Sequence, residues 1–449
     1  MNWSELPDLV AVALLACAFA SVARRGQTPV SGLWLTGWML IVLHFLAFMF
    51  LSAPGWRGIL AEDTGLVALA DAGVLFMYAA VPYRDEILSR LMFLSLLGTN
   101  TLYIYLINAR PASDWTLDSA AVLVGALPLT VAIVSLRKTN HMLRWMVVSL
   151  YCALSTFLLI VQHRPGDGGE LALNGVLFAV YFGCALLFWY TYGRATAGAF
   201  ITIAGFFAWA SVFVVAPWMG TFLPSFHIED EVWNLPKYVV AVGMILLLLE
   251  DQIEHNKYLA LHDELTGLPN RRLFLDRLTV ALDHARRTSS RTALLVVDLD
   301  QFKQVNDTLG HHVGDRLLQQ VGAIFTGRVR HSDTVARTGG DEFSVILEGT
   351  SSRESAGNVA DSLLQLLNEP MQVDEHAVRV GASIGVALFP DDAADMEALC
   401  IAADHHMYNE KRLSKEIDMR STHERSALHP VFAAQANADF CVARDRPRH

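Results

Sequence analysis

Long apolar segments dominate the first 250 residues, and they constrain the fold more than any other feature of the chain. Nine of them reach or approach the length that a helix needs to cross a bilayer. Only 27 of the chain's Lys, Arg, Asp and Glu residues lie in residues 1–250. The pattern predicts a multi-pass α-helical membrane domain over residues 1–250, followed by a soluble half. The expected spans are 6–23, 31–52, 65–82, 88–108, 117–136, 143–161, 171–192, 197–216 and 236–250.

Basic residues are unevenly shared between alternate loops of this membrane domain. Cytoplasmic loops of membrane proteins carry an excess of Lys and Arg. The bias therefore predicts that the N-terminus lies outside and that the chain from residue 250 onward lies in the cytoplasm. The richer set of loops contains Arg24, Arg25, Arg84, Arg90, Arg137, Lys138, Arg144 and Arg194, and the poorer set contains Arg57, Arg110, Arg164 and Lys237.

Two features of the membrane half each allow two interpretations. Asp71 lies inside the third expected span, where an acidic residue is costly and often marks a proton or ligand site. The alternative, which we favour, is a neutral or hydrogen-bonded carboxyl between helices, for example with Asn100. The aromatic-rich loop over residues 222–233 either binds an external ligand or forms an interfacial belt, and the belt is the more common arrangement.

A helical pattern continues from the last apolar segment into the soluble half, with no Gly or Pro between Glu250 and Gly267. Five positions follow one another at alternating spacings of three and four residues. This is the a/d pattern of a coiled coil with one polar position, as dimers use to fix their register. An ordinary amphipathic connector is the alternative. Residues 246–262 are predicted to form a helical stalk, and the five positions are Leu246, Leu249, Ile253, Asn256 and Ala260.

The soluble half mixes strand and helix patterns. Residues 292–300 have the composition of a buried strand that ends in acidic residues, and residues 378–389 form a second such segment. Helical patterns cover residues 313–329, 353–368 and 396–413. This order predicts a central sheet covered by helices, an α/β domain.

Between these elements lies the stretch DTVARTGGDEFSVILE, residues 333–348. Both flanks have strand patterns, so the insert TGGDE is expected at a hairpin tip. Gly339 and Gly340 permit a close backbone approach, and Asp341 and Glu342 concentrate negative charge beside them. Asp298 meets these two acids if the strands are neighbours. Three convergent carboxylates together with phosphates would hold Mg²⁺ (or Mn²⁺), a hard cation that prefers oxygen ligands.

Charge and cysteine content exclude some partners. The net charge is −11, which offers no basic surface to nucleic acid, so no nucleic-acid partner is expected. The five cysteines have neither metal-binding spacing nor a disulfide framework, which suits a soluble half that faces the cytosol. They are Cys17, Cys152, Cys184, Cys400 and Cys441.

Six separated motifs follow one another in the soluble half. They are HDELTGLPNRR (262–272), DLDQFKQVNDTLGHHVGD (298–315), RHSD (330–333), ARTGGDEF (336–343), ASIGVALFP (382–390) and ADHHMYNEK (403–411). In this order they resemble the GGDEF domain of diguanylate cyclases. The resemblance is specific because it rests on several motifs in the right order, and it places the domain at residues 263–418.

The resemblance implies a palm-like α+β fold related to nucleotide cyclases, and synthesis of cyclic di-GMP from two GTP molecules. It makes Asp298, the carbonyl of Leu299 and Asp341 the metal ligands. It makes Glu342 a further metal ligand or the base that takes the proton from the ribose 3′-hydroxyl, which attacks the α-phosphate of the second GTP. Asp341 and Glu342 are thus the expected catalytic residues. Because each domain would hold one GTP, a homodimer is also implied.

The resemblance assigns further residues to the substrate. Phosphates would be neutralised by lysines and approached by the glycine backbone, while an amide and a carboxylate would recognise the guanine edge. The implied substrate-binding residues are Asn306 and Asp315 for guanine, His311 for the ribose side, Gly339 and Gly340 for the phosphates, and Lys303, Lys411 and Lys415 for their charge.

Two further pairs of residues bear on regulation and affinity. Arg330 and Asp333 have the RxxD spacing of the family's inhibitory site for the product cyclic di-GMP; taken alone they would be a surface pair of little energetic weight. Lys415 stands where the family commonly has arginine, and Ser414 where it has glycine. Lysine keeps the charge but loses the forked hydrogen-bonding geometry, so weaker triphosphate binding is expected.

The leading hypothesis is a diguanylate cyclase in a bacterial-type inner (cytoplasmic) membrane, with its GGDEF domain in the cytoplasm and regulated by a signal sensed through the membrane half. One alternative is a catalytically weak GGDEF domain that acts as a receptor for GTP or cyclic di-GMP, although the acids that such domains usually lose are present. A transporter with an attached regulatory cyclase is a second alternative, against which the few intramembrane charges argue. Residues 419–449 lack periodicity and are predicted to form a disordered tail.

Overall fold

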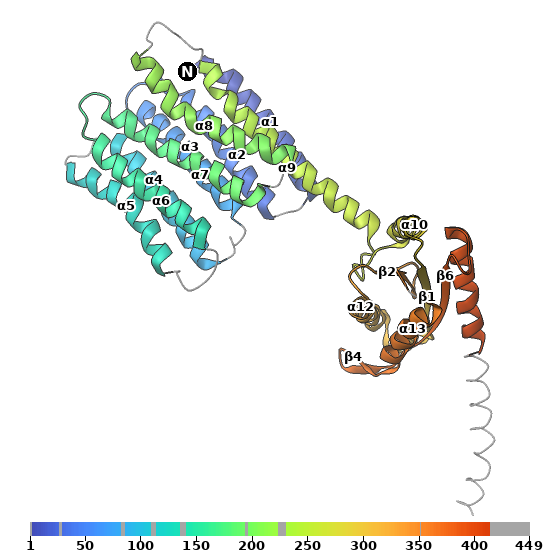
Figure 1. Cartoon of the computed structure of the whole chain (residues 1–449). Coiled ribbons are helices and arrows are strands. Elements are labelled where there is room, and N and C mark those ends of the chain that lie inside the picture. The colour runs from blue at the N-terminus through green and yellow to red at the C-terminus, as the bar shows by residue number, and fades with distance from the viewer. Residues whose placement is uncertain are drawn as a thin grey trace, which may run out of the picture. The chain divides into compact units, whose positions relative to one another are not determined.

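The chain divides into two compact units, Met1–Glu254 and His255–His449. The computed structural model describes residues 2–26, 29–81, 86–108, 114–134, 141–193, 196–222, 230–350 and 352–413 (Figure 1). Lys415 and the expected tail at 419–449 lie outside the described residues, as does most of the aromatic loop at 222–233.

The N-terminal unit consists of long helices. Eight of the described helices are long and apolar enough to cross a membrane. A short 3₁₀ turn, η1 (Trp3–Glu5), precedes them. The helices are α1 (Leu6–Gly26), α2 (Pro29–Phe48), α3 (Trp56–Ala80), α4 (Ile87–Asn108), α5 (Asp114–Val134), α6 (His141–Val161), α7 (Gly168–Tyr192), α8 (Ala197–Phe222) and α9 (Asp230–Leu261).

The helix that is not among these eight is α3, which contains the third expected span. It carries the charged residues Arg57, Glu62, Asp63 and Asp71. α3 nevertheless packs closely on α7, because a Cβ at Gly73 would lie 2.2 Å from Val180 Cγ1. The total of nine spans therefore stays a prediction.

The surroundings of two polar residues in this unit differ from those predicted from the sequence. Asp71 does make a hydrogen bond between helices, but its partner is the Thr101 hydroxyl at 3.2 Å and not Asn100, which donates to the Tyr151 hydroxyl. The placement of Lys237 in a loop is wrong. Lys237 lies inside α9 and is buried, and its Nζ donates to Asn234 Oδ1 at 2.5 Å.

α9 begins six residues before the expected span because its polar start is bonded to α1. Asn234 donates to Asp8 Oδ2 at 2.5 Å, and the Tyr238 hydroxyl donates to the same carboxylate. At its other end α9 continues without a break to Leu261, and so includes nearly all of the expected stalk. Leu249, Ile253 and Leu259 are exposed along it.

The C-terminal unit is built on one four-stranded antiparallel sheet with the order β2-β3-β1-β6. Its strands are β1 (Thr292–Asp300), β2 (Thr334–Arg337), β3 (Glu342–Glu348) and β6 (Gly381–Phe389), and a separate hairpin consists of β4 (Met371–Val373) and β5 (His376–Val378). The hairpin expected around TGGDE is confirmed as β2–β3, and β3 lies beside β1.

Helices cover both faces of this sheet, as Figure 1 shows. Leu295 and Val297 of β1 face a core made with α12 and α13, while Leu294 and Val296 face a core made with α10 and the helix at 396–413. Strand side chains alternate between faces, so a strand covered on both sides is apolar throughout. The helices are α10 (Arg271–Thr288), α11 (Phe302–Leu309), α12 (His311–Arg328), α13 (Arg353–Asn368) and residues 396–413.

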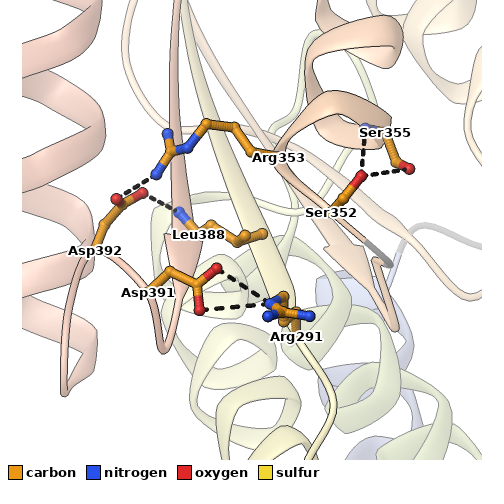
Figure 2. Close-up of polar contacts among 7 residues, drawn as sticks. All are labelled: Arg291, Ser352, Arg353, Ser355, Leu388, Asp391 and Asp392. Carbon is orange, nitrogen blue, oxygen red and sulfur yellow. Dashed lines mark hydrogen bonds and ion pairs between the residues drawn. The ribbon is translucent and has the colours of Figure 1, made fainter.

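The end of the sheet where β1 begins and β6 ends is braced by ion pairs. Figure 2 shows Arg291, just before β1, paired with Asp391 at 3.1 Å, and Arg353 at the start of α13 paired with Asp392. Asp392 also accepts the backbone N–H of Leu388 at 2.7 Å. Beside them Ser352 caps α13 by accepting the amide of Ser355 at 3.2 Å. The acidic hairpin lies at the opposite end of the strands.

Candidate functional site

The acidic residues predicted from the sequence meet where β1 ends and β3 begins. Asp298 and Glu342 are directly opposite each other in the antiparallel register. Asp341 precedes β3, and its carbonyl accepts the amide of Leu299 at 3.2 Å. Opposed residues on neighbouring strands lie about 5 Å apart. The sheet therefore brings Asp298, Leu299, Asp341 and Glu342 into one corner.

The two glycines of the hairpin have different surroundings. A Cβ at Gly339 would lie 2.6 Å from Glu342 Oε2, so this glycine leaves room for the Glu342 carboxylate to fold back over the turn. A Cβ at Gly340 would meet nothing within 4 Å. Gly340 therefore presents open backbone, which is what a phosphate group needs for close approach.

A lysine already neutralises part of this acidic corner. Lys411, on the helix at 396–413, donates to Asp298 Oδ1 at 2.5 Å, and Asp298 is only 7% exposed. Burial alone would lower the pKa of Lys411, but the hydrogen bond and charge of Asp298, with Asp341 and Asp300 nearby, raise it. The ammonium therefore stays charged at ordinary pH and occupies one side of Asp298.

The donor chemistry of the corner fits a hard divalent cation, although the side chains are not yet arranged around one. Among the residues that the structure describes, no three His, Cys, Asp or Glu side chains are grouped to hold a metal. The oxygen donors of Asp298, Asp341, Glu342 and the Leu299 carbonyl are of the kind that Mg²⁺ prefers. The Lys411 ammonium at Asp298 is itself a cation in this position, which supports the fit.

The residues expected to bind guanine lie on the next two helices. Asn306 is on α11, and His311 and Asp315 are exposed on the first turn and a half of α12. The two helices are joined at Gly310, whose φ of 89° turns the chain sharply. Asn306 Oδ1 is buried without a hydrogen-bond partner in the described part of the chain. Lys303 is exposed at the start of α11.

The Arg330–Asp333 pair has a local structural role as well. Asp333 Oδ2 accepts the backbone N–H of Arg330 at 2.9 Å, and its Oδ1 accepts the amide of Glu348 at 3.2 Å. The carboxylate of Asp333 thus fixes the turn before β2. The Arg330 side chain is exposed, and the contact with Asp333 is made by the Arg330 backbone.

A contact that the sequence did not predict holds the acidic hairpin to the start of the unit. Arg337 Nη1 contacts Asp263 Oδ1 at 2.9 Å, and its Nε and Nη2 donate to the Gly340 carbonyl at 3.1 and 2.7 Å. Both residues border a cavity of about 350 Å³ that Arg271, Arg272 and Gly339 also line. Asp263 lies in the motif HDELTGLPNRR and Arg337 in the motif ARTGGDEF. Membership of these motifs is the sequence signal that could have marked the two residues.

The antiparallel sheet, its two helical layers and the acidic β2–β3 tip define a GGDEF domain. Residues 260–416 match the family described as "Diguanylate cyclase, GGDEF domain". Residues 260–416 therefore form a GGDEF domain, and the N-terminal unit of apolar helices fits a membrane anchor.

Relatives in Pseudomonas aeruginosa include the bifunctional diguanylate cyclase/cyclic di-GMP phosphodiesterase MucR. It is 30% identical over 386 residues, which are 79% of this chain and 54% of MucR. The diguanylate cyclase TpbB is 39% identical over 168 residues, 37% of this chain and 39% of TpbB. The solved GGDEF domain of TpbB has 40% identity and a TM-score of 0.33, and the match covers 34% of this chain and 89% of that one. The chain thus spans about half or less of the length of these two curated relatives.

Proposed function

We propose that the protein is a diguanylate cyclase that condenses two GTP molecules into cyclic di-GMP and two pyrophosphates. The observation that carries this proposal is the pairing of Asp298 with Glu342 on adjacent strands, next to Asp341 and the open backbone of Gly340. An acidic corner beside an open turn is suited to a metal–triphosphate complex.

In each of the two condensations a ribose 3′-hydroxyl oxygen bonds to the α-phosphorus of the other nucleotide, and the bond from that phosphorus to pyrophosphate breaks. Glu342 takes the hydroxyl proton or helps to hold the metal. Asp298, Asp341 and the Leu299 carbonyl would hold Mg²⁺ or Mn²⁺, which when bound polarises the phosphate oxygens. Lys411 neutralises charge that develops on the phosphates.

Recognition of the nucleotide falls to the α11–α12 region. Asn306 and Asp315 bind the guanine edge, His311 lies on the ribose side, and Lys303 neutralises phosphate charge. The buried, unpartnered Asn306 Oδ1 supports this assignment, because such a group costs free energy unless a ligand satisfies it. Lys415, which lies outside the described residues, is proposed as a further phosphate contact.

Each domain holds one GTP and the reaction joins two, so the active enzyme is a homodimer in which two domains face each other. The exposed apolar positions along α9 support pairing through the stalk. The N-terminus lies outside a bacterial-type inner membrane, the GGDEF domain lies in the cytoplasm, and the membrane unit regulates it. These assignments rest on the apolar helices and the bias of basic residues.

The product inhibits the enzyme at Arg330 and Asp333. The exposed Arg330 guanidinium can form forked hydrogen bonds with phosphate, while Asp333 holds the turn that presents it. Arg330→Ala should leave the initial rate within about twofold of wild type and abolish the slowing of the reaction as cyclic di-GMP accumulates. Progress curves with and without added cyclic di-GMP measure the inhibition. An unchanged inhibition constant in the variant would contradict the assignment of Arg330 to the product site.

The decisive experiment uses the full-length protein in phospholipid nanodiscs with GTP and Mg²⁺, and measures cyclic di-GMP by mass spectrometry. Asp341→Asn and Glu342→Gln should each reduce the rate by about a hundredfold or more, since each removes a metal ligand or the base without changing side-chain size. Wild-type protein that binds GTP but makes no product would support the receptor function instead.

A further inference from the structure

A cavity of about 610 Å³ lies between α6, α7 and α8 of the N-terminal unit. Its size is in the range of pockets that enclose small ligands. Gly175 lets the Phe157 ring of α6 pack directly on the backbone of α7, because a Cβ there would lie 2.4 Å from Phe157 Cε1. Five aromatic side chains line the cavity together with aliphatic ones, and they are Phe157, Phe178, Phe213, Trp218 and Phe222.

Polar groups occur at only two levels of this apolar cavity. Arg164 and Asp167, in the turn between α6 and α7, lie at one end of it. Their contact, Nε to Oδ1 at 3.3 Å, joins side chains that are 64% and 50% exposed. An exposed pair of this kind contributes little, so a ligand acid can compete with Asp167 for the guanidinium.

The second polar level is Asn174 on α7, about two helical turns after the N-cap residue Asp167 and about 10 Å further along the helix axis. Asn174 makes no hydrogen bond with another residue in the described part of the chain. A polar side chain inside a bilayer is costly and usually has a function. Its amide can therefore bind an oxygen that a ligand carries into the apolar region.

We propose that this cavity binds an oxygenated fatty acid, with its carboxylate at Arg164, its chain against the aromatic wall and a hydroxyl or carbonyl group along the chain at Asn174. The chemistry fits each level of the cavity: a forked cation for the acid, rings for the methylene groups and an amide for the substituent. The site gives the membrane unit a ligand class of its own, independent of the reaction at the GGDEF domain.

The test uses cis-parinaric acid, a fluorescent fatty acid, with the full-length protein in nanodiscs of one saturated phospholipid. Energy transfer from tryptophan should show saturable binding. 12-Hydroxystearate should displace the probe at least fivefold more effectively than stearate, and Asn174→Leu should remove that difference. Arg164→Gln should weaken binding of both acids about tenfold.

Ala153→Phe, which fills the cavity from α6, should abolish binding, whereas Ala208→Phe, equally exposed on α8 but outside the lining, should not. Equal displacement by the two acids in the wild type, or binding unaffected by both Ala153→Phe and Arg164→Gln, would contradict the proposal. If bilayer phospholipid chains fill the cavity, the probe will show no saturable, variant-sensitive binding, and that result also overturns it.

An independent observation concerns Gly314 on α12, which faces Asn306 on α11. A Cβ at Gly314 would lie 1.9 Å from Asn306 Oδ1 and 3.3 Å from Phe302 Cζ. The Asn306 amide therefore sits in a space that only glycine leaves. Asn306 Oδ1 is buried there and has no hydrogen-bond partner in the described part of the chain. Its position is therefore fixed by packing against Gly314 and not by a hydrogen bond.

We infer that Gly314 is a positioning residue for nucleotide recognition, acting through Asn306; this rests on the proposed role of Asn306 in binding GTP. A methyl group at 314 forces the short Asn306 side chain to rotate away. The helix itself tolerates alanine, which favours helices by about 1 kcal/mol over glycine. Recognition should thus be lost while the fold is kept.

Gly327→Ala is the matched control, because Gly327 is on the same helix and a Cβ there would meet nothing within 4 Å. Gly314→Ala should raise both the Kd and the KM for GTP by about tenfold and leave kcat within about threefold, and Gly327→Ala should change none of them. In the Asn306→Ala background, Gly314→Ala should have no further effect.

The readouts separate this inference from the proposed function. Wild-type protein that makes no cyclic di-GMP contradicts the cyclase, but GTP binding still tests Gly314. An active wild type in which Gly314→Ala behaves like Gly327→Ala overturns the role of Gly314 alone. Additive losses in the Asn306→Ala and Gly314→Ala double variant also overturn it, because they indicate an effect that does not pass through Asn306.

Discussion

At the scale of single residues, Arg337 links the acidic turn to the segment that follows the stalk. One guanidinium contacts both the Asp263 carboxylate and the Gly340 carbonyl, which a lysine ammonium cannot reproduce in the same planar geometry. Burial alone would raise the pKa of Asp263, but hydrogen bonds from Thr266 and Arg337 lower it. The pair therefore fixes the turn on which Asp341 and Glu342 depend.

Arg337→Lys should reduce the rate of cyclic di-GMP formation by about tenfold, because loss of the fork frees the Gly340 carbonyl and loosens the turn. Thermal unfolding should change little, since the positive charge remains. Arg287→Lys, on the exposed end of α10, is the control and should have no effect on the rate. A rate for Arg337→Lys equal to that of the control would show that the turn holds its shape without the fork.

Sequence patterns predicted individual residues where the chemistry is local. Acids that end a strand or follow paired glycines stand out, so Asp298, Asp341 and Glu342 could be named in advance. Arg337 and Asp263 are 74 positions apart, and no local pattern connects them. The contact between Gly314 and Asn306 depends on the turn at Gly310, which decides how two helices face each other.

At the scale of elements, α9 is one continuous helix on which two exposed apolar residues, four positions apart, share one face. They are Leu249 and Ile253, which are 38% and 53% exposed. Large apolar side chains at helical spacing on an exposed face are the usual surface for a second helix.

Leu249→Glu combined with Ile253→Glu should shift the protein from dimer to monomer and reduce activity at least tenfold, because like charges replace the apolar contact. The matched control, Glu254→Gln with Lys257→Gln, changes polar positions of the same helix and should leave both properties unaltered. Mass photometry of nanodiscs and the cyclic di-GMP assay measure the two effects. Monomeric protein with full activity would refute pairing through α9.

The braced end of the sheet (Figure 2) predicts a pH-dependent contact. Burial alone would raise the pKa of Asp392, but hydrogen bonds from Arg353 and the Leu388 amide lower it in the folded state. A carboxyl with a lowered pKa stabilises the fold above its unfolded value, near 4, and this contribution is lost as the pH falls through the folded value.

Hydrogen exchange of the Leu388 amide, corrected for the intrinsic rate at each pH, should therefore show full protection at pH 6 and a decline below about pH 4. Asp392→Asn should remove the pH dependence, while Asp391→Asn, at the neighbouring pair, should retain it. A decline that persists in Asp392→Asn would assign the effect to another group.

Elements with a clear period were predicted well. β1 and α13 have the expected bounds of 292–300 and 353–368, because one is a continuous apolar run and the other begins at a serine cap. No element is predicted from pattern for α10 or for the β4–β5 hairpin. Strands of three residues are too short to show alternation, and α10 has only a narrow apolar stripe against the sheet.

At the scale of the whole molecule, the uneven distribution of basic residues is the feature that predicts orientation. Lys237 is buried in α9 and no longer counts as a loop charge. Arg24, Arg90 and Arg144 of the richer set also lie within helices, so the bias stays a prediction of orientation. The rule concerns loop charges and acts during insertion. It gives no account of which helices pack together.

Reporter fusions after residue 140 and after residue 255 should report the cytoplasm, and a fusion near residue 228 should report the outside. Alkaline phosphatase and green fluorescent protein give opposite readouts for the two compartments. A control fusion after residue 165 should agree with the one near residue 228. A cytoplasmic result near 228 would contradict this topology.

The contact between Lys411 and Asp298 means that, without substrate, the Lys411 ammonium serves as a counter-ion for the acidic corner. A metal that took Asp298 Oδ1 as a ligand would displace this ammonium, and the ammonium would then be free to meet an incoming phosphate. Metal and nucleotide should accordingly load cooperatively, each binding weakly without the other. Occupancy of the site would then depend on the concentrations of both free Mg²⁺ and GTP, and a rise in free Mg²⁺ alone would not fill it.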